Sequence, residues 1–178
     1  ALAALTLAPA APAAAATATE ESIRVIFASE WTMRESNSRL VCPANEVMIG
    51  RSHYGDENGY TTYYCGRIYI NDEQVVVTPT GGDATMREPD SFYSTPGDAV
   101  IIGRAHRGDE NGYTTYYAGA LSWQGKTVRL TSRQWTGSVR ETRHTSGSVI
   151  GRVMTGRSHA GDENGMTNYE YATVTIDG

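Results

Sequence analysis

A fifteen-residue stretch, GRSHYGDENGYTTYY at residues 50–64, recurs twice in the chain at a constant spacing of 53 residues. The second copy is GRAHRGDENGYTTYY at residues 103–117, and the third is GRSHAGDENGMTNYE at residues 156–170. Because length and spacing are both kept, one supersecondary unit is predicted to be used three times. No other feature of the sequence constrains the fold as strongly.

The repeats account for most of the 178-residue chain. They predict one β domain over residues 20–178, with repeats at about 20–72, 73–125 and 126–178. Residues 1–19 are different, because they consist of Ala, Leu, Pro, Thr and no charged residue. This composition predicts either the remnant of a secretory signal or an N-terminal arm of the mature protein. Both alternatives imply export, so the predicted localisation is extracellular.

Composition indicates an all-β fold. Nineteen glycines and eleven tyrosines, together with many Thr and Val residues, favour strands and tight turns over helices. About four strands are expected in each repeat, or twelve in total. The net charge of −5 and the absence of a basic cluster argue against a nucleic-acid partner. No stretch has the length and hydrophobicity to span a bilayer.

The two cysteines, Cys42 and Cys65, both lie in the first repeat, and neither has a cysteine equivalent in the other copies. In an exported protein such a lone pair is expected to form a disulfide, which would stabilise the fold by roughly 3 kcal/mol. In the hairpin register argued next, Cys65 lies opposite Ile49, so Cys42 must approach from a neighbouring segment.

The register of the repeated hairpin follows from the positions that stay fixed between copies. A three-residue Asp-Glu-Asn loop followed by Gly59 in the left-handed conformation pairs His53 with Thr61 and Arg51 with Tyr63. This register places fixed positions opposite one another, whereas a four-residue loop would pair fixed positions with variable ones. One face then changes from apolar to polar along the strand.

Charged residues recur beside the apolar positions of each repeat, within the loosely repeated Thr-Met-Arg-Glu run and the outgoing strand of the hairpin. Charged side chains so close to apolar positions are usually paired with one another, so these residues are predicted to form a structural polar network. Its predicted members are Arg34, Glu35, Arg51, His53, Arg87, Glu88, Arg104, His106, Arg140, Glu141, Arg157 and His159.

The Asp-Glu-Asn-Gly loops exceed what a turn requires, since one Asp or Asn and one Gly are enough. Carboxylate, amide and hydroxyl groups can hold the vicinal hydroxyls of a sugar, and Tyr60 or Tyr113 could stack on its apolar face. Three copies would make the site multivalent. The predicted ligand-binding residues are Asp56, Glu57, Asn58, Thr61, Tyr63, Asp109, Glu110, Asn111, Thr114, Tyr116, Asp162, Glu163, Asn164, Thr167 and Tyr169.

The run of Asp56, Asn58, Thr61 and Tyr63 resembles the Asp-x-Asn-x-Val-x-Tyr motif of the monocot mannose-binding lectins. The tyrosine here follows the aspartate by seven residues rather than six. The resemblance covers about eight residues in each repeat and implies a lectin-like β-prism with three sheets. A β-trefoil, which also has three four-stranded units, is the alternative fold.

Metal binding and catalysis are weaker predictions. Asp56, Asn58 and a backbone carbonyl could bind Ca²⁺, but the loop lacks the bidentate Glu of an EF-hand. The three repeat histidines could meet as a zinc site, although nothing in the sequence brings them together. No nucleophile or acid–base motif is present, and three equivalent sites offer no distinct acid and base. We therefore expect a protein that is not an enzyme and has no cofactor.

Two functions follow from these observations. The first is a secreted, non-catalytic module that binds glycans through its three Asp-Glu-Asn-Gly loops. The second is an adaptor in a secreted multi-protein assembly, docked to other secreted proteins by its N-terminal arm and β surfaces. An Ala-rich exported leader before a compact β domain is similar in general character to the small subunits of bacterial umbrella toxin particles.

Overall fold

A computed structural model describes residues 21–109, 111–147, 151–162 and 164–176 of the chain. The described residues contain sixteen β-strands and no helix, which confirms the all-β prediction. Twelve strands were expected. Two of the four additional strands arise because the long first strand of the chain corresponds to two shorter strands in each of the other repeats. The other two are the short strands Glu73–Gln74 and Lys126–Thr127. The predicted arm at residues 1–19 lies outside the described residues.

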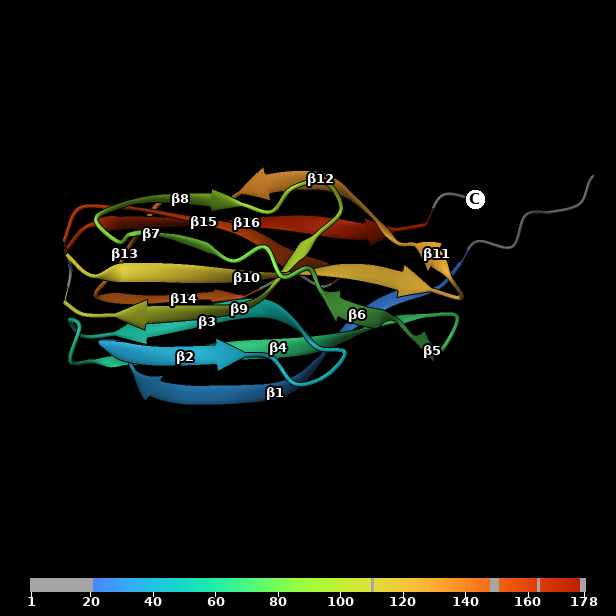
Figure 1. Cartoon of the computed structure of the whole chain (residues 1–178), viewed down its shortest axis with the longest axis horizontal. Coiled ribbons are helices and arrows are strands. Elements are labelled where there is room, and N and C mark those ends of the chain that lie inside the picture. Colours follow the sequence, from blue (N-terminus) through green and yellow to red (C-terminus); the bar gives the residue numbers. More distant parts are fainter. Residues whose placement is uncertain (1–20, 110, 148–150, 163, 177–178) are drawn as a thin grey trace, which may run out of the picture.

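The strands form three sheets (Figure 1). The first contains, in spatial order, β1 (Ile23–Arg34), β4 (Tyr60–Ile70), β3 (Val47–Tyr54) and β14 (Arg143–Gly147), with β5 (Glu73–Gln74) beside β4. The second contains β11 (Lys126–Thr127), β10 (Tyr113–Trp123), β9 (Val100–Arg107) and β2 (Asn37–Val41), with β6 (Val76–Pro79) and β7 (Ala84–Arg87) beside β10. The third contains β12 (Arg129–Trp135), β16 (Met166–Thr175), β15 (Arg152–Ala160) and β8 (Asp90–Ser94), with β13 (Val139–Arg140) beside β16. The finer choice between a β-prism and a β-trefoil stays a prediction.

Each sheet is built around one repeated hairpin and completed by a strand from another repeat. Strand β2 of the first repeat pairs with β9 of the second, and β8 of the second pairs with β15 of the third. Strand β14 of the third repeat returns to pair with β3 of the first. This exchange is cyclic, so no sheet can be completed by its own repeat alone.

The predicted hairpin register is confirmed where the loop begins. His53 pairs with Thr61 and Arg51 pairs with Tyr63. Further along, Met48 lies opposite Cys65, and the register shifts between Met48 and Gly50. The predicted pairing of Cys65 with Ile49 is therefore wrong. The other two hairpins shift register at the corresponding place, which indicates one repeated β-bulge.

The prediction that Gly59 adopts the left-handed conformation is also wrong. The positive φ in this loop belongs to Gly55, at +103°, and Gly59 does not share it. A Cβ atom on Gly59 would lie 2.1 Å from the carbonyl oxygen of Tyr54. Glycine is required at that position because the loop backbone passes too close for any side chain.

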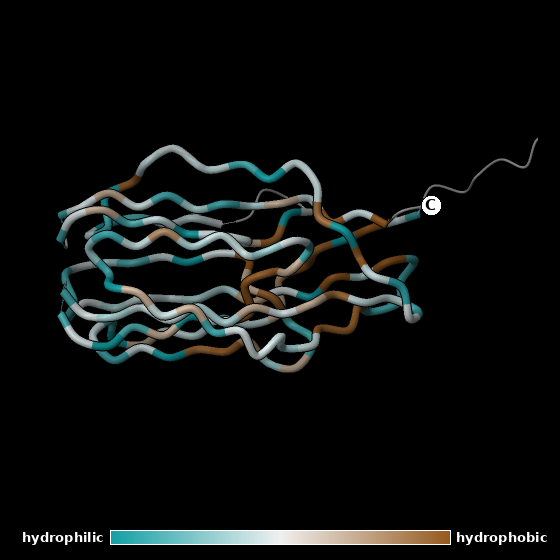
Figure 2. The backbone as a smooth tube through the Cα atoms, turned by 45° about the horizontal axis from the view of Figure 1, so that its top comes forward, coloured by the Kyte–Doolittle hydropathy of each residue, from teal (hydrophilic) through white to brown (hydrophobic). Residues whose placement is uncertain are grey.

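The interior changes from polar to apolar along the long axis. Aliphatic side chains, including Val47, Ile70 and Val100, form a buried cluster on the strand segments remote from the hairpin loops. A second cluster, which includes Met48 and Tyr63, occupies the middle of the molecule. Figure 2 shows hydrophobic positions gathered in the half that holds the C-terminal end. No helix among the described residues is long and apolar enough to cross a membrane.

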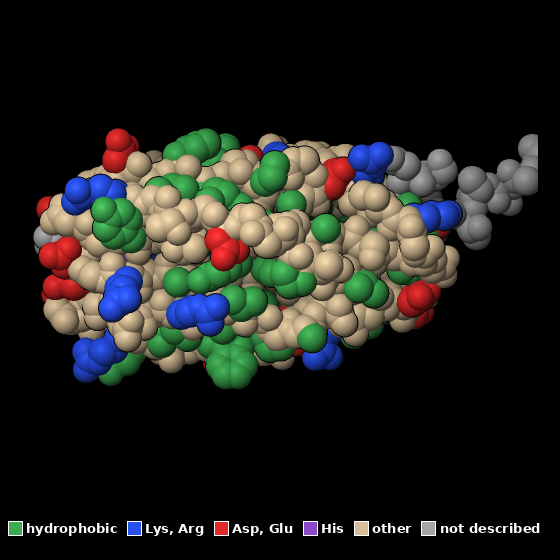
Figure 3. All heavy atoms as spheres, in the orientation of Figure 1, with side chains coloured by type: hydrophobic (Ala, Val, Ile, Leu, Met, Phe, Trp, Pro, Cys, Tyr) green, Lys and Arg blue, Asp and Glu red, His purple; other side chains and the backbone are tan. Residues whose placement is uncertain are grey.

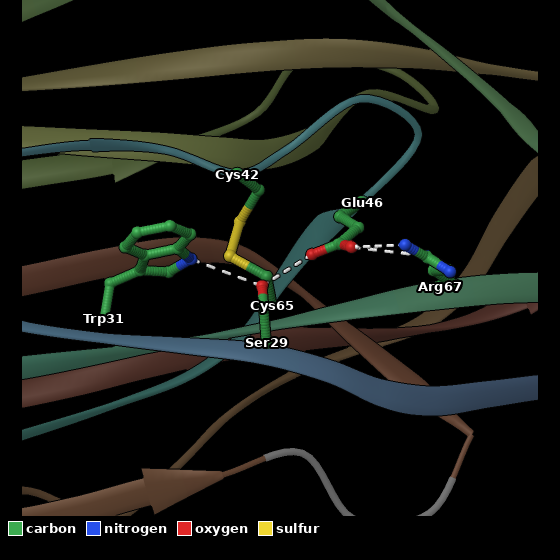
Figure 4. Close-up of a disulfide and its surroundings, with 6 residues drawn as sticks. All are labelled: Ser29, Trp31, Cys42, Glu46, Cys65 and Arg67. Carbon is green, nitrogen blue, oxygen red and sulfur yellow. Dashed lines mark hydrogen bonds and ion pairs between the residues drawn. A yellow bond between two sulfur atoms is a disulfide. The ribbon is translucent and has the colours of Figure 1, made fainter.

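The Cys42–Cys65 disulfide is confirmed (Figure 4). Cys42 follows β2, which pairs in the second sheet, whereas Cys65 lies on β4 of the first sheet. The bridge thus joins an exchanged strand to the hairpin of its own repeat. Beside it, the buried Glu46 accepts hydrogen bonds from Ser29 and Arg67.

Candidate functional site

Three arginines and three glutamates form a closed ring of buried ion pairs near the hairpin loops. Each arginine contacts two glutamates, and the nitrogen–oxygen distances are 2.7–3.2 Å. All six side chains are buried. In order around the ring, the residues are Arg51, Glu35, Arg104, Glu88, Arg157 and Glu141.

The ring joins residues of different repeats. Glu35 lies at the turn between β1 and β2 and contacts Arg51 of its own repeat and Arg104 of the next. Glu141 of the third repeat closes the ring on Arg51. Each arginine also donates a hydrogen bond to a buried tyrosine hydroxyl of another hairpin, as Arg104 does to Tyr63 at 2.9 Å. Contacts between different repeats therefore hold the buried polar core together.

Mutual pairing keeps these groups ionised. Burial alone would raise the pKa of Glu35, but Arg104 and Arg51 together hold that pKa well below its ordinary value. Burial would likewise lower the pKa of Arg51, and Glu141 and Glu35 raise it well above the usual range. The ring consequently contains three positive and three negative charges and is neutral as a whole.

The three repeat histidines lie next to this ring. His53 lies with its Nδ1 atom 4.0 Å from Glu35, and His106 and His159 each lie 3.9 Å from a ring glutamate. The other ring nitrogen of His53 donates a hydrogen bond to the carbonyl oxygen of Gly55. Burial first, and then the neighbouring arginines, lower the pKa of all three histidines. They are therefore neutral near pH 7.

Nine of the twelve predicted network residues are buried and belong to the ring or lie beside it, whereas three arginines do not. Arg34, Arg87 and Arg140 are exposed and lie outside the ring. Arg34 donates a hydrogen bond to the carbonyl oxygen of Asn58, and Arg87 does the same for Asn111. These two arginines hold the loops from the outer surface.

Six predicted ligand-binding residues are buried. Tyr63, Tyr116 and Tyr169 are at most 1% exposed, and the threonines that precede them are 0% exposed. Their hydroxyls are occupied by the network: Thr61, for example, accepts a hydrogen bond from Arg51. The prediction that these side chains face a ligand is corrected, because none of them reaches the surface. The residues concerned are Thr61, Tyr63, Thr114, Tyr116, Thr167 and Tyr169.

The Asp-Glu-Asn-Gly loops lie together at one end of the molecule (Figure 1). In the first loop, Oδ1 of Asp56 accepts a hydrogen bond from the backbone amide of Asn58, and the same bond occurs in the other two loops. The side-chain amide of Asn58 donates a hydrogen bond to the carboxylate of Glu57. One carboxylate oxygen of each Asp therefore stabilises its turn. Glu110 and Glu163 lie outside the described residues.

The loops are fixed to the β1–β2 turn and its equivalents through their backbones. Gly59 accepts a hydrogen bond from the amide of Glu35, and the carbonyl of Glu57 accepts one from Ser36. Glu88 and Glu141 make the bond corresponding to that of Glu35. The backbone that places the ring glutamates therefore also fixes the loops.

Acidic and arginine side chains lie side by side on the surface of this end (Figure 3). The exposed aromatic residues here are Tyr54, Tyr60 and Tyr113, which are 67%, 53% and 55% exposed. The guanidinium of Arg34 lies 5.3 Å from the ring centre of Tyr60. In the third repeat Met166 replaces the tyrosine, so the three loops are not equivalent in their aromatic neighbours.

A groove of about 480 Å³ opens beside the first loop on the outer side of the first sheet. Tyr54 and Tyr60 line it together with Arg143, which lies 5.6 Å from the ring centre of Tyr54. Ser52 and Thr62 add hydroxyl groups to the wall. Sequence reasoning missed Tyr54 and Arg143, because β14 brings Arg143 from the third repeat. The available signal was that neither of the other copies has a tyrosine at the position of Tyr54.

No group of three or more His, Cys, Asp or Glu side chains in the described part of the chain is arranged to hold a metal ion. The Ca²⁺ and zinc alternatives gain no support from this geometry. Searches against protein-family models, curated proteins and solved structures found no match for this chain.

Proposed function

We propose that this protein is a secreted, non-catalytic module that binds glycans through the surface around its three Asp-Glu-Asn-Gly loops. The observation that carries the proposal is the grouping of exposed tyrosines with carboxylate, amide and guanidinium groups at one end of the molecule. Aromatic faces provide apolar contact, and the polar groups provide directional hydrogen bonds. This combination suits a sugar ring.

The groove beside the first loop is the best-formed candidate subsite. Its two exposed tyrosines present aromatic surface, and Arg143, Ser52 and Thr62 supply donors and acceptors within the same depression. The second loop keeps one such tyrosine, Tyr113, whereas the third has Met166. We therefore propose one stronger and two weaker subsites, whose combined avidity exceeds the affinity of any one of them.

A glycan array probed with the full-length protein tests this proposal. We expect selective binding that weakens when Tyr60→Ala and Tyr54→Ala remove the stacking surface. Tyr69→Ala is the matched control, because Tyr69 lies near the far end of β4 and packs on Arg24. Binding to no glycan by the folded protein would overturn the proposal, and so would equal losses in the test and control variants.

The charge of the loops can be tested without disturbing their turns. Asp→Asn at positions 56, 109 and 162 keeps an acceptor for the turn amide, which Asp→Ala would remove. We expect these three changes together to weaken glycan binding and to leave the thermal midpoint nearly unchanged.

The second candidate function is an adaptor in a secreted multi-protein assembly. It is favoured by large exposed apolar side chains on the outer faces of the sheets, such as Phe27, 58% exposed, and Phe92, 65% exposed. Phe92 stacks on Trp135 of β12 with ring centres 5.2 Å apart. The disulfide fits an oxidising compartment. Affinity capture of the natively secreted protein, with intact-mass analysis, should yield stoichiometric partners and a retained N-terminal arm if this function is the correct one.

A further inference from the structure

A small cavity of about 30 Å³ lies between the buried ion-pair ring and the hairpin loops. All the described residues that line it are glutamates, aspartates and histidines. The three ring glutamates and the three repeat histidines line its inner part, and Asp56, Glu57 and Asp162 contribute from the loops. Among the described residues no arginine lines the cavity, since the ring guanidinium groups contact the glutamates and tyrosines of the ring.

Several buried atoms at this cavity have no hydrogen-bond partner. They are Oε2 of Glu88 and Nδ1 of His53 and His106. Oε2 of Glu35 contacts the guanidinium of Arg51, at 3.0 Å, and keeps free lone pairs. The four side chains are only 2–7% exposed. Because His53 donates from its other ring nitrogen to Gly55, its Nδ1 atom carries a lone pair. Oε2 of Glu35 is 4.0 Å from that Nδ1 atom, so one donor placed between them could bond to both.

We propose that this cavity binds the ammonium group of a lysine side chain contributed by a partner protein. An ammonium group has three N–H donors and no acceptor, which complements the carboxylate oxygens and unprotonated Nδ1 atoms that face the cavity. An anion would be repelled by the carboxylates. A guanidinium group is wide and planar, whereas the cavity holds little more than one water-sized group. A bound metal ion is disfavoured by the absence of a ligating cluster in the described residues.

The narrow cavity also selects the source of the ammonium group. A lysine carries its charge on a thin, flexible four-carbon stem that can pass between the loops. The ammonium of an amino sugar is attached directly to a ring, and that ring is too large to enter. The cavity and the proposed glycan groove share His53, but their remaining lining residues differ. The lysine proposal is tested with lysine probes and the glycan proposal with glycans, so either can fail without the other.

Nuclear magnetic resonance of the histidine side chains in the full-length protein tests the proposal. The probe is Nα-acetyl-lysine methylamide, compared with the same compound acetylated at Nζ. We expect saturable shifts in at least one of His53, His106 and His159 with millimolar affinity, and no response to the acetylated probe. His144 is an internal control, because it lines the groove of the first sheet and not this cavity.

Neutralising the loop carboxylates provides a second test. The triple variant Asp56→Asn, Glu57→Gln, Asp162→Asn should weaken binding of the lysine probe by about tenfold. Asp72→Asn is the matched control, since Asp72 is an exposed carboxylate beyond the far end of β4, and it should leave affinity unchanged. If the triple variant fails to fold, the comparison of the two probes on the wild-type protein still tests whether the cavity binds the lysine ammonium.

Three results would overturn the proposal. The first is an equal response to both lysine probes. The second is a saturable response of these histidines to Ca²⁺, Zn²⁺ or glucosamine with none to the lysine probe. The third is the absence of any saturable shift, which would mean that the cavity holds only water.

Discussion

At the scale of single residues, the arginine–glutamate ring illustrates how far sequence reasoning reaches. The pairing of Arg51 with Glu35 could be predicted, because both belong to one repeat and both lie beside apolar positions. The contact of Arg51 with Glu141 could not, since ninety residues separate them and the strand exchange brings them together. The prediction that the tyrosines face a ligand failed for the same reason. The arginines that donate hydrogen bonds to the hydroxyls of Tyr63 and Tyr116 come from other repeats.

Removing one arginine from the ring should destabilise the protein strongly. Arg104→Met leaves Glu35 and Glu88 buried beside an incomplete set of partners, which is expected to lower the free energy of unfolding by about 3–5 kcal/mol. Arg24→Met is the control, because Arg24 and Asp72 form an exposed pair and the expected loss is about 1 kcal/mol or less. Urea denaturation measures both variants.

A loss in Arg104→Met no larger than that in Arg24→Met would show that the ring contributes little to stability. If Arg104→Met does not fold at all, Arg104→Lys should give an intermediate loss. Lysine keeps the charge but cannot contact both glutamates through a planar fork.

His144 should make stability sensitive to acid. Burial and the nearby Arg51 lower the pKa of His144 to about 4, from an ordinary value of 6.5. Between these two values the unfolded chain binds a proton that the folded protein resists, so the free energy of unfolding falls as pH is lowered. The other repeats have Ser38 and Ser91 at this position. His144→Ser should therefore flatten the pH dependence from about pH 6.5 to 4 in urea denaturation.

The remaining pH dependence of His144→Ser should come from the three repeat histidines and the ring glutamates. The pKa values of these groups are also lowered in the folded protein, so the free energy of unfolding falls as they are protonated on acidification. An unchanged slope in His144→Ser would contradict a buried neutral imidazole at position 144.

At the scale of the hairpin, the repeated positions identified the register near the loop correctly. They did not reveal the bulge that follows, because Ile49 continues the apolar alternation of Val47. A partial signal was the glycine after the bulge in every copy. A Cβ atom on Gly50 would lie 2.6 Å from the carbonyl oxygen of Ser146 on the exchanged strand β14. That cause is visible only once the neighbouring strand is in place.

Gly59→Ala tests the close approach inside the loop. The added methyl group would collide with the carbonyl oxygen of Tyr54, and we expect a loss of about 1–3 kcal/mol in the free energy of unfolding. Gly137→Ala is the matched control, because a Cβ there meets no atom within 4 Å and should change stability by about 0.5 kcal/mol or less. Equal losses in the two variants would contradict the steric explanation.

At the scale of the whole molecule, the sequence predicted an all-β chain and a disulfide, and both are confirmed. The cyclic exchange of β2, β8 and β14 was not predicted, because pairing between repeats leaves no local pattern in the sequence. The exchange determines the candidate sites. It closes the ion-pair ring, and it carries Arg143 to the groove beside Tyr54.

The central claim is that ligands bind at the end of the molecule that carries the three loops. Backbone amide spectra of the labelled full-length protein, recorded during titration with glycans selected on the array, test it most directly. We predict saturable shifts concentrated at residues 52–62, 107–113, 143–145 and 160–166, with no change at the opposite ends of the strands. Saturable shifts confined to those opposite ends, or no saturable shift with any glycan, would contradict the claim.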